Sequence, residues 1–157
     1  PHYSTLQNNL YKDQLPKGYR FDLPTEAQWE FAARGGNKSN EYTYSGSNEL
    51  NEVAWYKGNS CTINSFRTHD VGQKQQNELG LYDMTGNVAE WCRDWLDDYR
   101  EYAVTDPTGS ESGSIRMMRG GSWLYGADRC RVAYRFYRGP DYRSSNIGFR
   151  LALVPID

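Results

Sequence analysis

The sequence predicts an α+β domain with short helices, a small twisted antiparallel sheet and long loops. Its 157 residues are enough for one domain with a buried core. Aromatic residues make up 15% of the chain although hydrophobic residues reach only 38%, which argues against disorder and predicts a core built from aromatic rings. Short apolar segments are separated by long stretches rich in Asn, Ser and Gly, so we expect a surface made mostly of loops.

The first predicted elements lie between residues 19 and 33. Residues 19–23 alternate between polar and apolar side chains, which indicates a short strand. A helix is expected to begin after Thr25 and to run to about Ala33, because Thr25 and Gln28 have the spacing of a capping box and Gly35-Gly36 would end it. Its larger apolar residues lie on two faces and predict packing on more than one side: Trp29, Phe31 and Ala32.

The later elements are shorter and more widely separated. We expect loops over residues 36–60 and 97–114. Between these loops, Trp91 and Trp95 lie four residues apart, a spacing that would bury both on one face of a helix. Residues 117–123 and 147–154 are predicted to form strands.

Charge and cysteine content exclude several classes of protein. The net charge of −2 gives no indication of nucleic-acid or membrane binding by the whole chain, and no apolar run is long enough to cross a bilayer. Cys61, Cys92 and Cys130 have no zinc-binding spacing, and we expect free thiols. The chain begins with Pro1 rather than Met, so an upstream portion is expected to be missing from it.

Arginine is concentrated in the last third of the chain. One interpretation is structural, with guanidinium groups bound to carboxylates and backbone carbonyls; the other is an arginine-bearing interface. The residues concerned are Arg116, Arg119, Arg129, Arg131, Arg135, Arg138, Arg143 and Arg150.

Few residues suit catalysis. His2 and His69 are the only histidines, and neither has a metal-ligand spacing. The sequence contains neither a G-x-S-x-G nucleophile elbow nor a glycine-rich phosphate loop with a lysine. We therefore expect a binding domain rather than an enzyme, with no required cofactor.

The segment from Gly80 to Trp95 contains hard oxygen ligands. Asp83 and Glu90 flank a turn with Gly86, whose carbonyl groups could point inward, and such a donor set suits Ca²⁺. The alternative is that Asp83 caps a turn and Glu90 pairs with an arginine.

Four ordered blocks carry a family resemblance: residues 23–36 (LPTEAQWEFAARGG), 80–95 (GLYDMTGNVAEWCRDW), 119–123 (RGGSW) and 146–150 (NIGFR). In this order they resemble the formylglycine-generating-enzyme (sulfatase-modifying factor) family, which implies a C-type-lectin-like fold. Because the family's N-terminal part has no counterpart here, residues 1–157 are expected to form a single domain that lacks that part.

The resemblance also implies site residues. It assigns a structural Ca²⁺ to the side chains of Asp83 and Glu90 and the carbonyls of Gly86 and Val88. The family's enzymes hold copper with two cysteines; Cys130 matches one, but Tyr125 occupies the other position. One thiolate leaves no soft Cu(I) site, so we expect Cys130 to be a small buried residue.

Residues 123–147 resemble the variable region of proteins diversified by diversity-generating retroelements. Trp123, Ala133, Tyr134, Pro140 and Ile147 would be scaffold. Ligand contacts are expected from Leu124, Tyr125, Gly126, Phe136, Tyr137, Arg138, Gly139, Tyr142, Ser144, Ser145 and Asn146. None of these eleven residues is Lys, Glu, Gln, Met or Trp, the residues that an Asn codon cannot yield when only its two adenines change.

The composition of these positions suits a binding surface, since aromatic anchors, one arginine and small adaptable residues are typical of antibody-like contact surfaces. Phe136 to Tyr142 follow no strand or helix period, which favours exposure over burial in the core. We therefore expect a surface that binds another macromolecule, most simply a protein, and no nucleic acid. Resemblance to treponemal variable proteins implies display at the bacterial surface, with membrane contact only through an upstream lipid anchor. The alternatives are a formylglycine-generating-type oxidase and a calcium-dependent lectin of fixed specificity.

Overall fold

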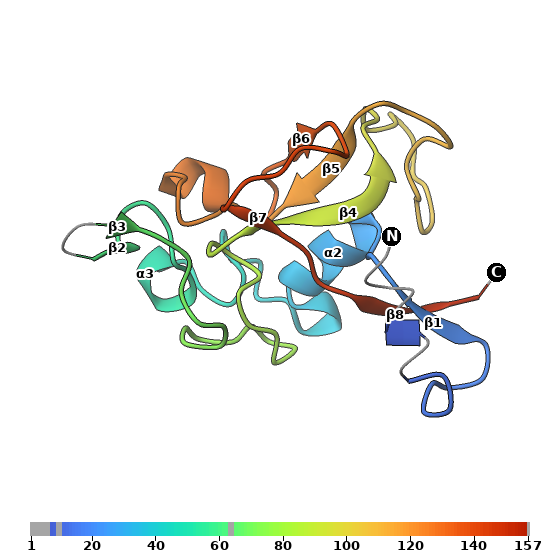
Figure 1. The fold of residues 1–157 in the computed structure, drawn as a ribbon, viewed down its shortest axis with the longest axis horizontal. Coiled ribbons are helices and arrows are strands. Elements are labelled where there is room, and N and C mark those ends of the chain that lie inside the picture. Colours follow the sequence, from blue (N-terminus) through green and yellow to red (C-terminus); the bar gives the residue numbers. More distant parts are fainter. Residues whose placement is uncertain (1–6, 9–10, 63–64, 157) are drawn as a thin grey trace.

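The computed structural model describes residues 7–8, 11–62 and 65–156. Short helices and small sheets are joined by long loops, as the sequence predicts (Figure 1). In chain order the elements are β1 (Tyr19–Asp22), α2 (Glu26–Ala33), the 3-10 helix η1 (Gly36–Lys38), α3 (Leu50–Val53), β2 (Cys61–Thr62), β3 (Ser65–Phe66), β4 (Ala89–Trp95), β5 (Arg116–Arg119), the 3-10 helix η2 (Ala127–Cys130), β6 (Phe136–Arg138), β7 (Ile147–Gly148) and β8 (Ala152–Pro155).

Strands from opposite ends of the chain pair with each other. β1 and β8 form an antiparallel two-stranded sheet in which Tyr19 lies opposite Pro155 and Asp22 opposite Ala152 (Figure 1). The predicted strand at residues 19–23 is therefore confirmed. The strand predicted over residues 147–154 is instead divided into β7 and β8, each of which pairs with a different sheet.

Helix α2 begins where its capping signal predicts. The Thr25 side chain accepts a hydrogen bond from the Gln28 backbone N–H, and the Gln28 side chain accepts one from the Thr25 N–H. Trp29 and Ala33 are buried, and the helix packs against β4 and β5. Phe31 is 56% exposed, so the expectation of packing on more than one side is wrong.

A four-stranded sheet with the order β6-β5-β4-β7 forms the centre of the domain. β4 and β5 are antiparallel, as are β5 and β6, whereas β4 and β7 are parallel, so the sheet is mixed rather than wholly antiparallel. β5 ends at Arg119, earlier than predicted, because Gly120 and Gly121 adopt positive φ angles of 95° and 73° and turn the chain out of the sheet. This turn directs the chain out of β5 before it reaches η2.

The segment around Trp91 is a strand, not the helix that the spacing of Trp91 and Trp95 suggested. Glu90, Cys92 and Asp94 are buried, and the two tryptophans are half-buried on the opposite face. Residues four apart share a face in a strand as they do in a helix, so the spacing alone does not distinguish the two. The strand forms because β5 and β7 lie on its two sides and bond its backbone groups.

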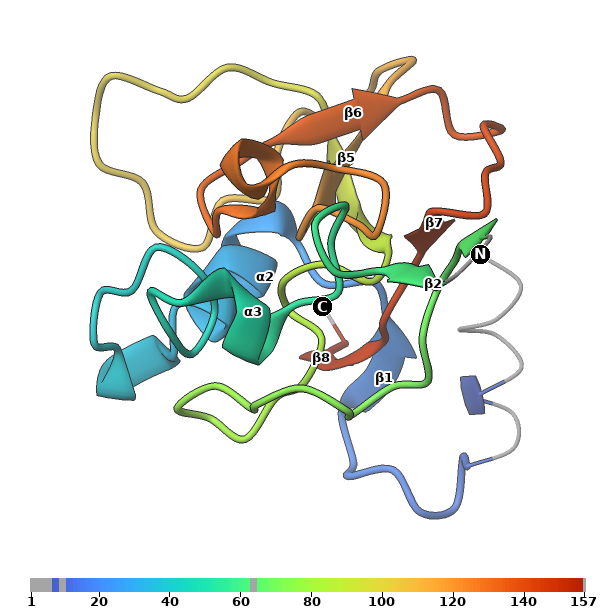
Figure 2. The same ribbon diagram turned by 90° about the vertical axis from the view of Figure 1, so that its left-hand side faces the viewer.

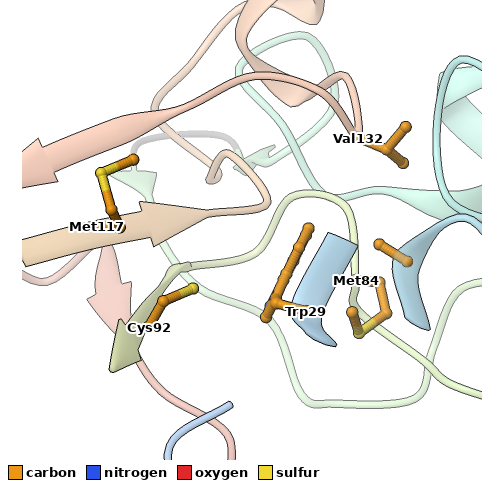
Figure 3. Packing of buried hydrophobic residues seen from close by; sticks show 6 residues of the cluster. Trp29, Met84, Cys92, Met117 and Val132 are labelled. Carbon is orange, nitrogen blue, oxygen red and sulfur yellow. The ribbon is translucent and has the colours of Figure 1, made fainter. Parts of the chain in front are cut away.

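Two apolar clusters make up the core. The first lies between α2 and the sheet and combines one aromatic ring with sulfur-containing and aliphatic side chains (Figure 3); the second lies around α3. Most tyrosines remain exposed or half-buried, so the predicted core of aromatic rings is wrong for this residue type. The first cluster comprises Trp29, Ala33, Met84, Cys92, Met117 and Val132, and the second Leu50, Val53, Ala54 and Cys130.

Buried ion pairs link α2 and the sheet to the end of the chain. Glu26 binds Arg135 through two hydrogen bonds of 2.7 Å and also pairs with Arg119, whose side chain is 0% exposed. Glu90 binds Arg150 at 2.6 and 2.8 Å. Because buried charges are costly unless paired, these contacts are part of the scaffold. Within the described ranges, no helix has the length and apolar character needed to cross a bilayer.

Candidate ligand-binding face of the C-terminal segment

The segment from Trp123 to Ile147 leaves the sheet after β5, rejoins it at β6 and returns to it again at β7. Between these points it forms η2 and then β6, which pairs with β5. In Figure 2, η2 and β6 lie in the upper part of the molecule, and the loop to β7 follows its upper right-hand edge. We call this surface, formed by residues 124–145, the contact face.

Hydrogen bonds to other segments of the chain fix the backbone of the contact face. The Trp123 N–H donates to the Asn87 carbonyl at 2.9 Å, and the Tyr125 carbonyl accepts from Lys57 N–H at 3.0 Å. The Val132 N–H donates to the Thr43 carbonyl at 3.0 Å. Trp123 and Val132 are buried, so the segment is held by both hydrogen bonds and packing.

Most residues predicted to contact a ligand are accessible. Leu124, Tyr137 and Tyr142 are 46%, 48% and 49% exposed, so three large side chains of this segment are open to solvent. Arg138, Gly139 and Ser145 are exposed; Tyr125, Gly126 and Ser144 are half-buried.

Phe136 and Asn146 require correction, because both are buried, with exposures of 9% and 4%. Phe136 stacks on Tyr125 with ring centroids 4.8 Å apart, which covers the side chain that the sequence pattern placed at the surface. The Asn146 side-chain amide donates to Ser122 Oγ. The Asn146 backbone carbonyl accepts from the Ala89 N–H at 2.9 Å. Both residues support the contact face from beneath.

Only some of the predicted scaffold positions are buried or half-buried. Trp123 is buried, and Tyr134 and Ile147 are half-buried, as a supporting role requires. Ala133 and Pro140 are exposed, so their assignment to the scaffold is not matched by burial.

The structural interpretation holds for part of the late arginines, and the interface interpretation of the others stays a prediction. Half-buried Arg116 donates to the Arg93 carbonyl. Arg119, Arg135 and Arg150 form ion pairs with glutamates and hold the scaffold. A second group is exposed on the contact face: Arg129, Arg131, Arg138 and Arg143.

Cys130 lies beneath the contact face, as the sequence predicts. It is 0% exposed and packs in the cluster around α3, next to half-buried Tyr125. Burial raises the pKa of the Cys130 thiol from 9.0 to about 11, against the lowering effect of a backbone hydrogen bond with Ser122. A neutral, inaccessible thiol is a poor nucleophile and a poor metal ligand. Cys92 is likewise free and buried, and the side chain of Cys61 lies outside those that the structure describes.

The raised pKa predicts a pH dependence of stability. The folded state holds the Cys130 proton more tightly than the unfolded state, so this stabilisation is complete below about pH 9 and is lost as the pH rises through about 11. We expect a loss of about 2 kcal/mol over this range. Urea denaturation of the wild type and Cys130→Ala at several pH values measures it. We expect Cys130→Ala to be less stable than the wild type at every pH, but its free energy of unfolding should fall less steeply as the pH rises. Equal slopes in the two proteins would contradict the assignment of the pH dependence to Cys130.

The implied calcium ligands are Asp83, Gly86, Val88 and Glu90. Both Glu90 oxygens are already bound, by Arg150 and by the Trp29 indole N–H at 2.7 Å. Asp83 accepts from the Gly72 N–H at 2.7 Å. Among the described residues, no group of three or more His, Cys, Asp or Glu side chains is placed to hold a metal. In this geometry Arg150 binds both Glu90 oxygens, so Glu90 could bind a calcium ion only after releasing Arg150.

Calcium binding therefore stays a prediction, and thermal denaturation with and without CaCl₂ checks it. A bound ion would raise the melting temperature, and the rise would disappear in Asp83→Ala. An unchanged melting temperature would leave Glu90 with its ion-pair role alone.

A cleft that the sequence did not predict borders the contact face. It has a volume of 760 Å³ and lies between α2 and the loop that follows β4, with Ala133 and Arg135 in its wall. Phe31, Tyr99 and Val104 expose apolar surface there. Phe31 lies two residues from each of the buried Trp29 and Ala33 and therefore off their face of α2, and this apolar residue is the local signal that could have indicated the cleft.

Comparisons with known proteins place this geometry in a family. The model of the sulfatase-modifying factor enzyme 1-like domain matches residues 2–154. The chain is 41% identical over 130 residues to chaperone protein LppX of Paenibacillus barcinonensis, a match covering 74% of this chain and 42% of the relative. It is 39% identical over 145 residues to the formylglycine-generating enzyme of Streptomyces coelicolor, covering 83% and 46%.

Among solved structures, Treponema denticola variable protein 1 superposes with a TM-score of 0.76 and 46% identity, covering 84% of this chain and 47% of that protein. This likeness confirms the α+β, C-type-lectin-like fold class expected from the sequence. The chain spans less than half the length of each of the three proteins compared. The family model and the relatives agree in covering most of this chain, which therefore belongs to the family of sulfatase-modifying factor enzyme 1-like domains.

Proposed function

We propose that this chain is a ligand-binding domain that contacts another protein through the contact face, and that it is not an enzyme. The observation that carries the proposal is the exposure of Tyr137 and Tyr142, at 48% and 49%. Tyr137 lies on strand β6, which pairs with β5, and the Tyr142 N–H donates to the Gly139 carbonyl in the loop that follows. Tyrosine offers a large contact area with few rotors, and a preordered backbone lowers the entropy cost of binding.

The contacting residues are the accessible members of the predicted set. Tyr137 and Tyr142 serve as anchors, and Arg138 adds directed hydrogen bonds. Phe136 keeps Tyr125 in place by stacking at 4.8 Å rather than touching the ligand. The full set of proposed contacts is Leu124, Tyr125, Gly126, Tyr137, Arg138, Gly139, Tyr142, Ser144 and Ser145.

We further propose that these positions are diversified by a retroelement. The likeness to a protein named as variable supports this, as does the concentration of accessible positions on one segment. Display at a bacterial surface through an upstream lipid anchor belongs to the same proposal.

Deep sequencing of the 3′ end of the gene from many cells of one lineage tests diversification. We expect substitutions at the codons of the contact positions, with Trp123 constant because it is buried under the segment. A uniform sequence from cells with an active reverse transcriptase would instead favour a fixed specificity.

Binding itself gives a direct prediction. In Tyr137→Ala and Tyr142→Ala, affinity for a peptide selected on the domain from a random display library should fall about 30-fold, or about 2 kcal/mol, in each variant. Surface plasmon resonance measures the change. Tyr102→Ala removes a tyrosine that is 63% exposed outside the contact face and should bind normally. Equal binding by all three variants would place the ligand elsewhere.

The second candidate function is a formylglycine-generating-type oxidase, which the 39% identity to such an enzyme favours. Against it stand Tyr125 in place of a cysteine and the complete burial of Cys130. Copper binding and oxidation of a cysteine-containing peptide test it. Turnover that is lost in Cys130→Ala would overturn the binding-domain proposal.

A further inference from the structure

We propose that the partner of the contact face is an acidic protein surface, recognised through carboxylate groups by exposed arginines set among apolar side chains. This inference rests on the proposed function and names the chemistry of its ligand.

The charge of the segment is opposite to that of the chain. Residues 124–146 contain five arginines, two aspartates and no lysine or glutamate, which gives a net charge of +3 in a chain of net charge −2. Arg135 is already bound by Glu26. The exposed charged residues of the segment are therefore four arginines and two aspartates: Arg129, Arg131, Arg138, Arg143, Asp128 and Asp141.

Two of the exposed arginines, Arg131 and Arg138, are held in place without being neutralised. Arg138 donates to the Tyr137 carbonyl at 2.9 Å, and its guanidinium lies 5.6 Å from the centre of the Tyr142 ring. Arg131 donates to the Asp128 carbonyl at 3.0 Å. A carbonyl or an aromatic ring orients a guanidinium but leaves its full charge and most of its N–H donors available.

Arg129 is the one member of this group with a carboxylate within ion-pair range in the described part of the chain. Its Nε lies 3.9 Å from Asp128 Oδ2, with both side chains more than half exposed, so the pair is weak. Its guanidinium also lies 5.6 Å from the centre of the Tyr125 ring. The described carboxylates form no ion pair with Arg131, Arg138 or Arg143.

The scaffold arginines provide the contrast within the same chain. Arg119, Arg135 and Arg150 each pair with a buried or half-buried glutamate. The contact face lacks such partners, and a protein ligand could supply them. Guanidinium groups bind carboxylates through two parallel hydrogen bonds, and positioning the arginine beforehand reduces the entropy lost on binding.

Apolar side chains on the same face favour a protein over a polyanion. Leu124, Tyr137 and Tyr142 expose nearly half of their surface beside the arginines. Asp128, whose side chain is 75% exposed, would repel a continuous row of phosphates or sulfates. A protein surface with discrete carboxylates between apolar patches matches this arrangement.

Selection of a random-peptide phage library on the purified chain tests the inference. Enriched peptides should contain more Asp and Glu than the input library. The affinity of the strongest peptide should fall about tenfold or more in the double variant Arg138→Gln, Arg143→Gln, and also when NaCl is raised from about 50 to about 300 mM. Arg20→Gln, in the distant strand β1, is the matched control and should bind as the wild type does.

Each other outcome is decisive. Peptides that bind the wild type but not Tyr137→Ala, yet carry no excess of acidic residues, would overturn this inference and leave the proposed function standing. Peptides unaffected by any contact-face variant would overturn the proposed function. Heparin or single-stranded DNA bound more tightly than the peptides, and lost in the double arginine variant, would replace the acidic protein with a polyanion.

Discussion

Replacement of Glu26 by alanine is expected to destabilise the domain by about 3–5 kcal/mol, because it removes one partner from a buried ion network. Glu26 is 7% exposed and is the carboxylate shared by Arg119 and Arg135. Its loss would leave Arg119, which is 0% exposed, with Glu30 as its remaining carboxylate partner among the described residues. It would also leave Arg135 without the two hydrogen bonds that anchor it.

Urea denaturation measures this effect as a lower midpoint with an unchanged slope. Glu26→Gln keeps the shape of the side chain and loses its charge, so it should lie between the wild type and the alanine variant and remain measurable if Glu26→Ala does not fold. Arg34→Ala is the control, since it removes an exposed i,i+4 pair with Glu30 and should cost about 0.5 kcal/mol or less. Similar stabilities of Glu26→Ala and Arg34→Ala would contradict a structural role for the network.

Gly121→Ala is expected to cost about 3 kcal/mol and to displace the start of the contact face. Gly121 has a φ of 73°, which disfavours any side chain. An added Cβ would also lie 2.8 Å from the Arg129 carbonyl oxygen, 2.8 Å from Cys130 Sγ and 2.9 Å from Cys130 Cα. Because backbone atoms at these distances have no room to yield locally, η2 would have to move.

Gly139→Ala is the matched control on the same segment. Gly139 has no neighbouring atom within 4 Å of an added Cβ and no positive φ, so stability should change by about 0.5 kcal/mol or less. Besides urea denaturation, limited trypsin digestion reports the movement of η2, since Arg129 and Arg131 flank Cys130 and are exposed. Equal digestion of the two variants would show that η2 stays in place.

The scaffold and the surface that it carries are expected to respond differently to substitution. Glu26 and Gly121 are buried positions where substitution disturbs the whole domain. Tyr137, Tyr142 and Gly139 are exposed positions where substitution changes only what is presented. A domain organised in this way tolerates many sequences on the contact face, which is the physical requirement of the proposed diversification.

The sequence by itself determined the first strand, the first long helix and the accessible part of the contact face. Thr25 and Gln28 of the capping box lie three positions apart, so α2 begins where the pattern predicts. Strand β1 follows from the alternation at residues 19–23. The exposure of Tyr137 and Tyr142 follows from the absence of any period around Gly139 and Pro140. Ordered motif blocks identified the family because they span most of the chain.

Only the tertiary structure decided which polar residues are buried and which aromatic residues are covered. Glu26 lies 109 residues from Arg135, and Glu90 lies 60 residues from Arg150, so no local pattern reveals either pair. β4 is a strand because β5 and β7 pair with it from distant parts of the chain. Phe136 is buried because Tyr125, eleven residues earlier, stacks on it. Burial and pairing depend on contacts between segments far apart in the chain, whereas caps, turns and exposed loops depend on neighbours a few residues away.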